Sequence, residues 1–168
     1  LDESIPKEER KYGRKNLYEM ISASNVKTFR SRPLIPKSML AKERDGLLIG
    51  SACELGEVIQ AILRGEDDEE LLRIASFYDY LEIQPNGNNE FMLRESNQEY
   101  TVSKKGEQRY NPYWKINTQE DLTNINKKVV ELADKLGKLV VATGDVHVLK
   151  PEDSKLRAIV MASKGFDD

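Results

Sequence analysis

Apolar residues recur at helical spacing in several stretches of this chain, and short apolar runs lie between some of them. The clearest helical stretch, 118–137, carries an apolar stripe made of Leu122, Ile125, Val129, Leu132 and Leu136. Thr118 followed by Asp121 is typical of a capped helix start, and Gly137 is typical of a helix end. The same period predicts further helices over 16–25, 38–46, 54–65, 67–78 and 151–163.

Two of these helices have a face that we expect to be buried. In 16–25 the apolar face consists of Leu17, Met20 and Ile21. In 54–65 it consists of Leu55, Val58, Ile59 and Ile62. Short strands are predicted at 47–50, 80–84 and 138–143. The first and the last are expected to be buried because they are almost entirely apolar. Helices that alternate with short apolar strands predict an α/β fold with mostly parallel strands and outer helices.

Two segments do not fit this alternation. Residues 1–11 are charged and poor in apolar side chains, which indicates a linker or tail. Residues 94–117 are polar and lack a helical period, which indicates a long loop or hairpin.

Composition narrows the functional classes. The chain has 168 residues, a formal net charge of −3 and 33% charged residues, so charge alone does not indicate a nucleic-acid binder. No apolar run is long enough to cross a membrane. A lone cysteine, Cys53, fits a reducing compartment, and we expect a cytoplasmic protein. The chain begins with Leu1, so we expect a fragment of a longer protein.

Candidate metal ligands follow two of the predicted strands. Asp145 and His147 come after the strand at 138–143, and His147 is the lone histidine. Cys53 follows the strand at 47–50. The carboxyl ends of parallel strands meet at one edge, so these side chains are expected to converge there. Carboxylate, imidazole and thiolate all bind zinc or manganese, although a structural histidine and a buried thiol remain open alternatives.

Three glutamates lie near these positions. Glu54 and Glu57 open a predicted helix, where a carboxylate also compensates the helix dipole. Glu82 lies within an apolar strand, where a carboxylate needs a partner. A structural role is the favoured interpretation for Glu82 and for at least one of the other two, and support of the metal ligands by all three is the alternative.

Basic and aromatic residues offer a weaker hypothesis of nucleic-acid contact. Lys27, Arg30, Arg32, Lys37, Lys42 and Arg44 are close together in sequence. Tyr110, Tyr113 and Trp114 could stack on bases, but packing of their loop onto the domain is the favoured interpretation. A nucleophilic serine or cysteine would need a histidine base, and His147 alone is available.

A set of ordered motifs identifies a family resemblance. The segments are "RKNLYEMIS", "RPLIPKSML", "DGLLIGSACELGE", "IASFYDYLEIQPNGNNEFM" and "VVATGDVHVLKPED". Together they closely resemble the PHP (polymerase and histidinol phosphatase) domain of PolC-type DNA polymerase III alpha subunits over residues 12–168. The resemblance implies part of a distorted (β/α)7 barrel, the portion that follows an inserted proofreading exonuclease.

The same resemblance implies a metal site and a parent activity. It assigns Asp145, His147 and Cys53 to a site for zinc, manganese or magnesium, while the family's other histidines precede the exonuclease. Metal binding by this chain alone is therefore expected to be weak or absent, and no catalytic residue is assigned to it. The parent would be a DNA-directed DNA polymerase whose partners are DNA, replisome components and the rest of the PHP domain. A freestanding PHP phosphoesterase is the alternative.

A partial barrel also predicts an exposed sheet edge. Strands that a closed barrel would supply are missing, so apolar surface would remain uncovered. We expect the chain to associate with itself through residues 47–50 or 25–34.

Overall fold

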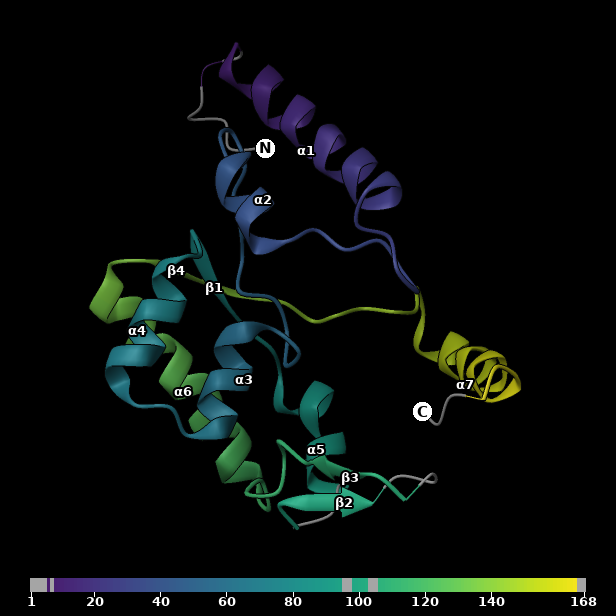
Figure 1. Ribbon diagram of the computed structural model, residues 1–168. Coiled ribbons are helices and arrows are strands. Elements are labelled where there is room, and N and C mark those ends of the chain that lie inside the picture. The colour runs from purple at the N-terminus through teal and green to yellow at the C-terminus, as the bar shows by residue number, and fades with distance from the viewer. Residues whose placement is uncertain (1–5, 7, 95–97, 103–105, 166–168) are drawn as a thin grey trace. The chain divides into compact units, whose positions relative to one another are not determined.

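The computed structural model describes residues 6, 8–94, 98–102 and 106–165 (Figure 1). The chain divides into two compact units. The first unit comprises Leu1–Glu82 and Lys128–Val141, and the second comprises Ile83–Lys127 and Ala142–Asp168. Helix α6, Gln119–Leu136, contributes residues to both.

Two helices open the first unit. Helix α1 spans Glu9–Val26 and is longer than predicted, because it includes charged residues with good helix propensity before residue 16. Its expected apolar face is only partly buried: Met20 is 1% exposed, whereas Leu17 and Ile21 are 39% and 44% exposed. Helix α2 spans Lys37–Lys42 and follows the extended residue Pro36.

Helices α3, Glu57–Arg64, and α4, Asp68–Ser76, supply much of the core of this unit. Val58, Ile59, Leu71 and Ile74 are all buried. The predicted stripe of α3 was wrong at Leu55, which is 73% exposed because the helix begins only at Glu57. Gly65 ends α3 with a φ of 76°, and the Asp67 carboxylate caps α4 by accepting from the Glu70 N–H.

A small parallel sheet lies beside these helices. Strands β1, Tyr80–Ile83, and β4, Leu139–Ala142, are neighbours in it. The predicted strand at 47–50 forms only an isolated parallel bridge from Gly50 to Tyr80, and the expectation that it is buried was wrong, because Leu48 is 57% exposed. The hydroxyl of Ser51 continues this contact by accepting a hydrogen bond of 2.9 Å from the Glu82 N–H. Leu81 in β1 is fully buried.

The expectation that the last strand is buried was wrong. In β4, Leu139 is 76% exposed and Val141 is 38% exposed. An apolar run indicates burial only if other elements cover it, and within the described residues β4 has β1 as its sole strand neighbour. The sequence "KLVVAT" gives no information on that coverage.

Helix α6 has the capping and the apolar face that its sequence predicts. The Asp121 N–H donates to the Thr118 hydroxyl at 3.2 Å, and the Asp121 carboxylate accepts from the Thr118 N–H at 2.9 Å. Leu122, Ile125, Val129 and Leu132 are buried. After Gly137, the ammonium group of Lys138 donates to the carbonyls of Ala75, Ser76 and Tyr78 at the end of α4.

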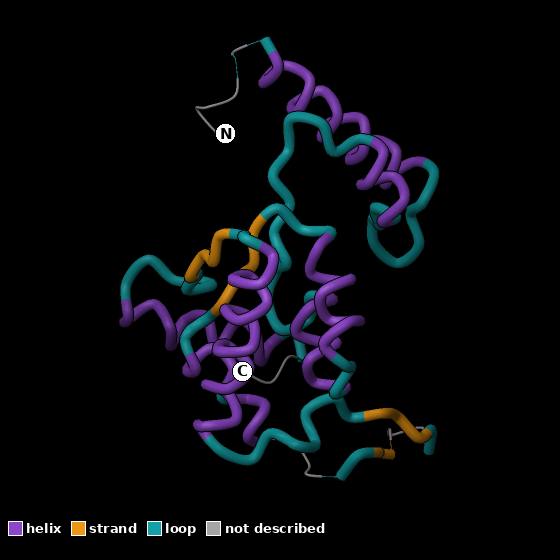
Figure 2. Tube along the Cα trace, turned by 90° about the vertical axis from the view of Figure 1, so that its left-hand side faces the viewer, coloured by secondary structure: helices purple, strands orange, loops and turns teal. Residues whose placement is uncertain are grey.

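The second unit contains short elements that follow β1 and others that follow β4. After β1 come the 3-10 helix η1, Asn86–Asn89, and α5, Phe91–Arg94. Strands β2, Tyr100–Val102, and β3, Gln108–Tyr110, pair antiparallel, with Tyr100 opposite Tyr110 (Figure 2). The 3-10 helix η2, Pro151–Asp153, leads into α7, Ser154–Ser163.

The observed class is therefore mixed α/β, with 51% helix and a small parallel sheet. The described residues do not show a closed (β/α)7 barrel, because they contain one parallel strand pair and one antiparallel hairpin. In the described part of the chain, no helix is long and apolar enough to span a membrane.

The turn before α3 requires glycine, which gives a stability prediction. A Cβ atom on Gly56 would overlap the carbonyl oxygen of Ser51 and approach that of Cys53 to 2.9 Å. Gly56→Ala should therefore lower the free energy of unfolding by about 1–3 kcal/mol. The measurement is urea denaturation followed by circular dichroism. Gly87→Ala is the matched control, because nothing lies within 4 Å of its Cβ position and little change is expected. Equal effects of the two changes would contradict the close approach.

Candidate functional site

The predicted ligands Asp145 and His147 lie in the second unit, on the segment that leaves β4. The Thr143 N–H donates to the Ile83 carbonyl at 3.0 Å, and the Asn88 side chain donates to the Gly144 carbonyl at 2.8 Å. Asp145 then takes a left-handed conformation with a φ of 47°. The segment is therefore not a regular extended strand, although both side chains lie close together.

The geometry of this pair defines which histidine nitrogen is available. His147 Nδ1 lies 2.6 Å from the backbone oxygen of Asp145 and 3.9 Å from its carboxylate Oδ1. A carbonyl oxygen only accepts, so this hydrogen bond requires that Nδ1 carry the proton. The lone pair is then on Nε2, which is the arrangement of a metal-binding histidine whose other nitrogen is held by a hydrogen bond. Both side chains are more than half exposed.

The third predicted ligand, Cys53, lies in the first unit. It is half-buried and follows Ala52, whose φ of 61° is left-handed. The Gly56 N–H donates to the Cys53 carbonyl at 2.8 Å and closes the turn before α3. Burial raises the pKa of the Cys53 thiol, and the neighbouring Glu54 raises it further. Because a metal binds the thiolate, binding here would have to displace a firmly held proton.

The three nearby glutamates have different surroundings. The Glu57 carboxylate accepts from Lys37 Nζ at 2.5 Å and from the Tyr78 hydroxyl at 3.1 Å. Partial burial alone would raise the pKa of Glu57, but these two donors hold it below its usual value. Glu57 is therefore engaged in a structural ion pair. Glu82 is half-buried, and its backbone N–H donates to the Ser51 hydroxyl. The backbone carbonyl of Glu54 accepts a hydrogen bond of 2.7 Å from the Gln60 side chain.

Burial also raises the pKa of the Tyr78 phenol to about 12, with a further contribution from the Glu57 charge. Lys37 lies 4.4 Å from the centre of the Phe77 ring, and the Arg44 guanidinium lies 5.1 Å from it. Arg44 also forms a 2.8 Å ion pair with Asp79. Two members of the predicted basic cluster are thus engaged in structural contacts around Phe77.

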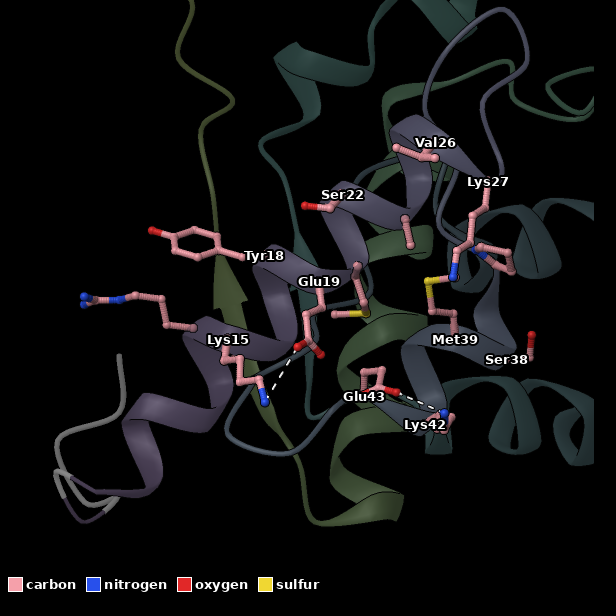
Figure 3. Close-up of a pocket in the computed structure, with 14 residues that line it drawn as sticks. Lys15, Tyr18, Glu19, Ser22, Val26, Lys27, Ser38, Met39, Lys42 and Glu43 are labelled. Atoms are coloured by element: carbon pink, nitrogen blue, oxygen red, sulfur yellow. Dashed lines mark ion pairs between the residues drawn. The ribbon is translucent and has the colours of Figure 1, made fainter.

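Two other residues of the basic cluster lie at a groove in the first unit. Lys27 and Lys42 line an open groove of about 1410 Å³ between α1 and α2 (Figure 3). Ion pairs Lys15–Glu19 and Lys42–Glu43 lie along it, and Met20 and Met39 contribute apolar surface. None of the predicted metal ligands lines this groove.

The aromatic residues of the long loop pack within the second unit. The Tyr113 ring lies 5.4 Å from Phe91, and the Tyr110 ring lies 5.9 Å from Tyr100. Both pairs have edge-to-face geometry, which is favourable for aromatic packing. This arrangement supports the interpretation of these rings as packing residues.

Sequence patterns did not single out a cluster of side-chain amides beside the Asp145 segment. Gln84, Asn86 and Asn126 line a cleft of about 440 Å³ that also includes Thr143 and Gly144. One signal was present in the sequence: Asn126 is a polar residue directly after Ile125 in the apolar stripe of α6.

The predicted ligands are thus divided between the units. The second unit provides Asp145 and His147, and the first provides Cys53. Across the described residues, no group of three or more His, Cys, Asp or Glu side chains is arranged to hold a metal ion. Carboxylate, imidazole and thiol are ligand types that bind zinc or manganese, and His147 has its Nε2 atom available as a ligand.

Comparison with known proteins gives matches along nearly the whole chain. No protein-family model matches it. It is 43% identical over 156 residues to the DNA polymerase III PolC-type of Clostridium perfringens and 49% identical over 156 residues to that of Caldanaerobacter subterraneus. It is 39% identical over 153 residues to the protein of the same name from Bacillus subtilis.

These matches cover 93% of the chain for the first two relatives and 91% for the third. The chain spans only 9 to 10% of the length of the relatives. It is therefore similar, over nearly all of its length, to a segment that makes up about a tenth of PolC-type DNA polymerase III proteins.

Proposed function

We propose that this chain is a segment of a replicative DNA polymerase III alpha subunit, located in the PHP domain after an inserted proofreading exonuclease. The main support is sequence identity: the chain is 43% and 49% identical to two PolC-type polymerases over 156 residues. The parent chain would act in the cytoplasm as a DNA-directed DNA polymerase with replisome partners. This segment would be a structural scaffold without catalytic activity of its own.

The scaffold role rests on what the described residues offer chemically. Asp145 and His147 supply a carboxylate and an imidazole on one short segment, and Cys53 supplies a thiol at the end of another. A divalent metal held by such groups would polarise a bound oxygen or stabilise the domain. Zinc, manganese or magnesium would need further ligands, which the proposal assigns to the part of the PHP domain that precedes the exonuclease.

The parentage can be tested by segment exchange. In the Clostridium perfringens polymerase, the aligned 156 residues are replaced by those of this chain. We expect the chimera to extend a primed template, because 43% identity over the exchanged residues should let the segment fold in place. Deletion of the same segment should abolish extension, and the 168-residue chain alone should neither extend a primer nor hydrolyse a phosphodiester with Mn²⁺ or Zn²⁺.

A soluble but inactive chimera would count against this proposal. Phosphodiester hydrolysis by the isolated chain that is lost in His147→Ala would instead support the freestanding phosphoesterase. Primer extension by the chimera and hydrolysis by the isolated chain are measured at the same substrate concentrations. The two results together discriminate between the polymerase segment and the phosphoesterase.

The metal assignment makes a separate prediction in the same chimera. Asp145→Asn, His147→Gln and Cys53→Ser should each weaken binding of divalent metal by at least about 10-fold. Metal content after dialysis against metal buffers, measured by mass spectrometry, checks this. Glu152→Gln is the matched control, because this exposed carboxylate lies outside the proposed ligand set. Unchanged metal content in all three variants would exclude these residues as ligands.

We also propose that the isolated chain associates with a second copy of itself. Apolar side chains are exposed in the predicted contact segments, including Phe29 at 54%, Leu34 at 39% and Leu48 at 57%. Leu48→Ser should reduce the mass measured by light scattering at micromolar concentration, because exposed apolar surface drives association. Leu156→Ser, at a residue 65% exposed on α7, should not. If the unsubstituted 168-residue chain is a monomer at this concentration, self-association is refuted.

A further inference from the structure

An uncharged cleft of about 440 Å³ lies in the second unit, at the carboxyl ends of β1 and β4. Its lining residues include Gln84, Asn86 and Asn126, which carry carboxamides, and the apolar residues Ile83, Pro85 and Ala142. The described residues that line it include no ionisable side chain. Ligands of open α/β sheets commonly bind outside the carboxyl ends of parallel strands.

Gln84 is the residue that points to a ligand. It is only 5% exposed, yet its carboxamide has no hydrogen-bond partner among the described residues. Its backbone carbonyl, in contrast, accepts from the Asn126 side chain at 2.8 Å. Its amide atoms are not among the described buried polar atoms that lack a partner, so they remain accessible to solvent, and a ligand would replace water at a carboxamide that no protein group holds.

The two asparagines are fixed by their own hydrogen bonds. Asn86 donates to the Gln119 carbonyl at 3.3 Å and to the Thr123 hydroxyl at 2.9 Å. Asn126 uses its amino group on the Gln84 carbonyl and on Asn86 Oδ1. The Oδ1 atom of Asn126 is left as an acceptor without a partner among the described residues. The cleft therefore offers a donor and an acceptor from Gln84 and a second acceptor from Asn126.

This pattern selects a class of ligand. A carboxamide pairs in two-point fashion with a planar edge that has an adjacent N–H and a ring nitrogen, as adenine has. The second acceptor favours a ligand with an exocyclic amino group, which can donate two protons. An anion is disfavoured because the cleft offers acceptors and no cation. The volume lies within the range of small-ligand pockets, about 300–1,000 Å³.

We propose that this cleft binds an unpaired nucleobase that carries an exocyclic amino group beside a ring nitrogen, as adenine and cytosine do. Gln84 reads the donor–acceptor edge, Asn126 accepts the second amino proton, and the apolar side chains contact the ring faces. The proposed polymerase function supplies the source of the base, an unpaired nucleotide of the DNA. Recognition itself depends only on the three carboxamides and needs no metal.

The test is a nucleoside titration of the purified 168-residue chain in buffer with EDTA. Adenosine, cytidine and thymidine are added in turn, and the side-chain amide signals are followed by ¹H–¹⁵N NMR. We expect saturable shifts at Gln84 and Asn126, with a Kd for adenosine on the order of 1 mM. Cytidine should bind comparably and thymidine more weakly, because thymine presents oxygen where the amino group is needed.

Substitutions separate recognition from folding. Gln84→Leu should weaken adenosine binding at least about 10-fold. Gln84→Glu keeps the side-chain size and removes the amide donor, so it should weaken binding too, even if Gln84→Leu fails to fold. Gln108→Leu is the control, because Gln108 is exposed on β3 and distant in sequence. Equal binding of thymidine, or adenosine binding that survives both Gln84 changes, would overturn the proposal.

This experiment can fail independently of the proposed function. Inactivity of the polymerase chimera would leave base binding by this chain measurable. Conversely, an absence of nucleoside binding would overturn the cleft assignment and leave the primer-extension result unaffected.

Discussion

Strand β1 is held on both of its edges, and the arrangement of both candidate sites depends on this. On one edge the Asp79 N–H donates to Ile49, Gly50 bridges Tyr80, and Ser51 accepts from Glu82. On the other edge lies β4. Leu81, fully buried, fixes which face of this four-residue strand points inward. A shift by one residue would exchange the two faces, so the pairing determines where each following loop starts.

The residues that follow these three segments carry the proposed chemistry. Cys53 follows the first, Gln84 and Asn86 follow β1, and Asp145 and His147 follow β4. Two of these loops begin in a conformation that non-glycine residues rarely adopt. Ala52 and Asp145 are the non-glycine residues with positive φ in the described part of the chain. Such a conformation costs about 1–3 kcal/mol and tends to be kept where a side chain must be placed. Aspartate tolerates it better than alanine, so the turn before Cys53 is the more demanding one.

The sequence predicted elements that are defined by local chemistry. Thr118, Asp121 and Gly137 delimit α6 because capping and a left-handed end involve residues a few positions apart. It could not predict properties that depend on distant contacts. Glu57 is tied to Lys37 and Tyr78, which are 20 and 21 residues away, and the exposure of β4 depends on what covers it. Leu55 was misassigned because the helix start at Gly56 is fixed by contact with Ser51. The amide cleft was missed because no motif marks it, although Asn126 interrupts an apolar face.

The two proposed sites differ in their physical dependence on protons. A metal bound by the Cys53 thiolate would displace the thiol proton, so binding there would strengthen as pH rises. The burial that raises the pKa of Cys53 moves this requirement to higher pH. The carboxamides of Gln84, Asn86 and Asn126 do not titrate, so recognition at the cleft is insensitive to pH over the same range. Both groups of residues follow strands of one sheet, yet one depends on removing protons and the other on hydrogen bonds that are already in place. The cleft would therefore recognise its ligand without any change of protonation in the protein, whereas metal binding at Cys53 would first require loss of the thiol proton.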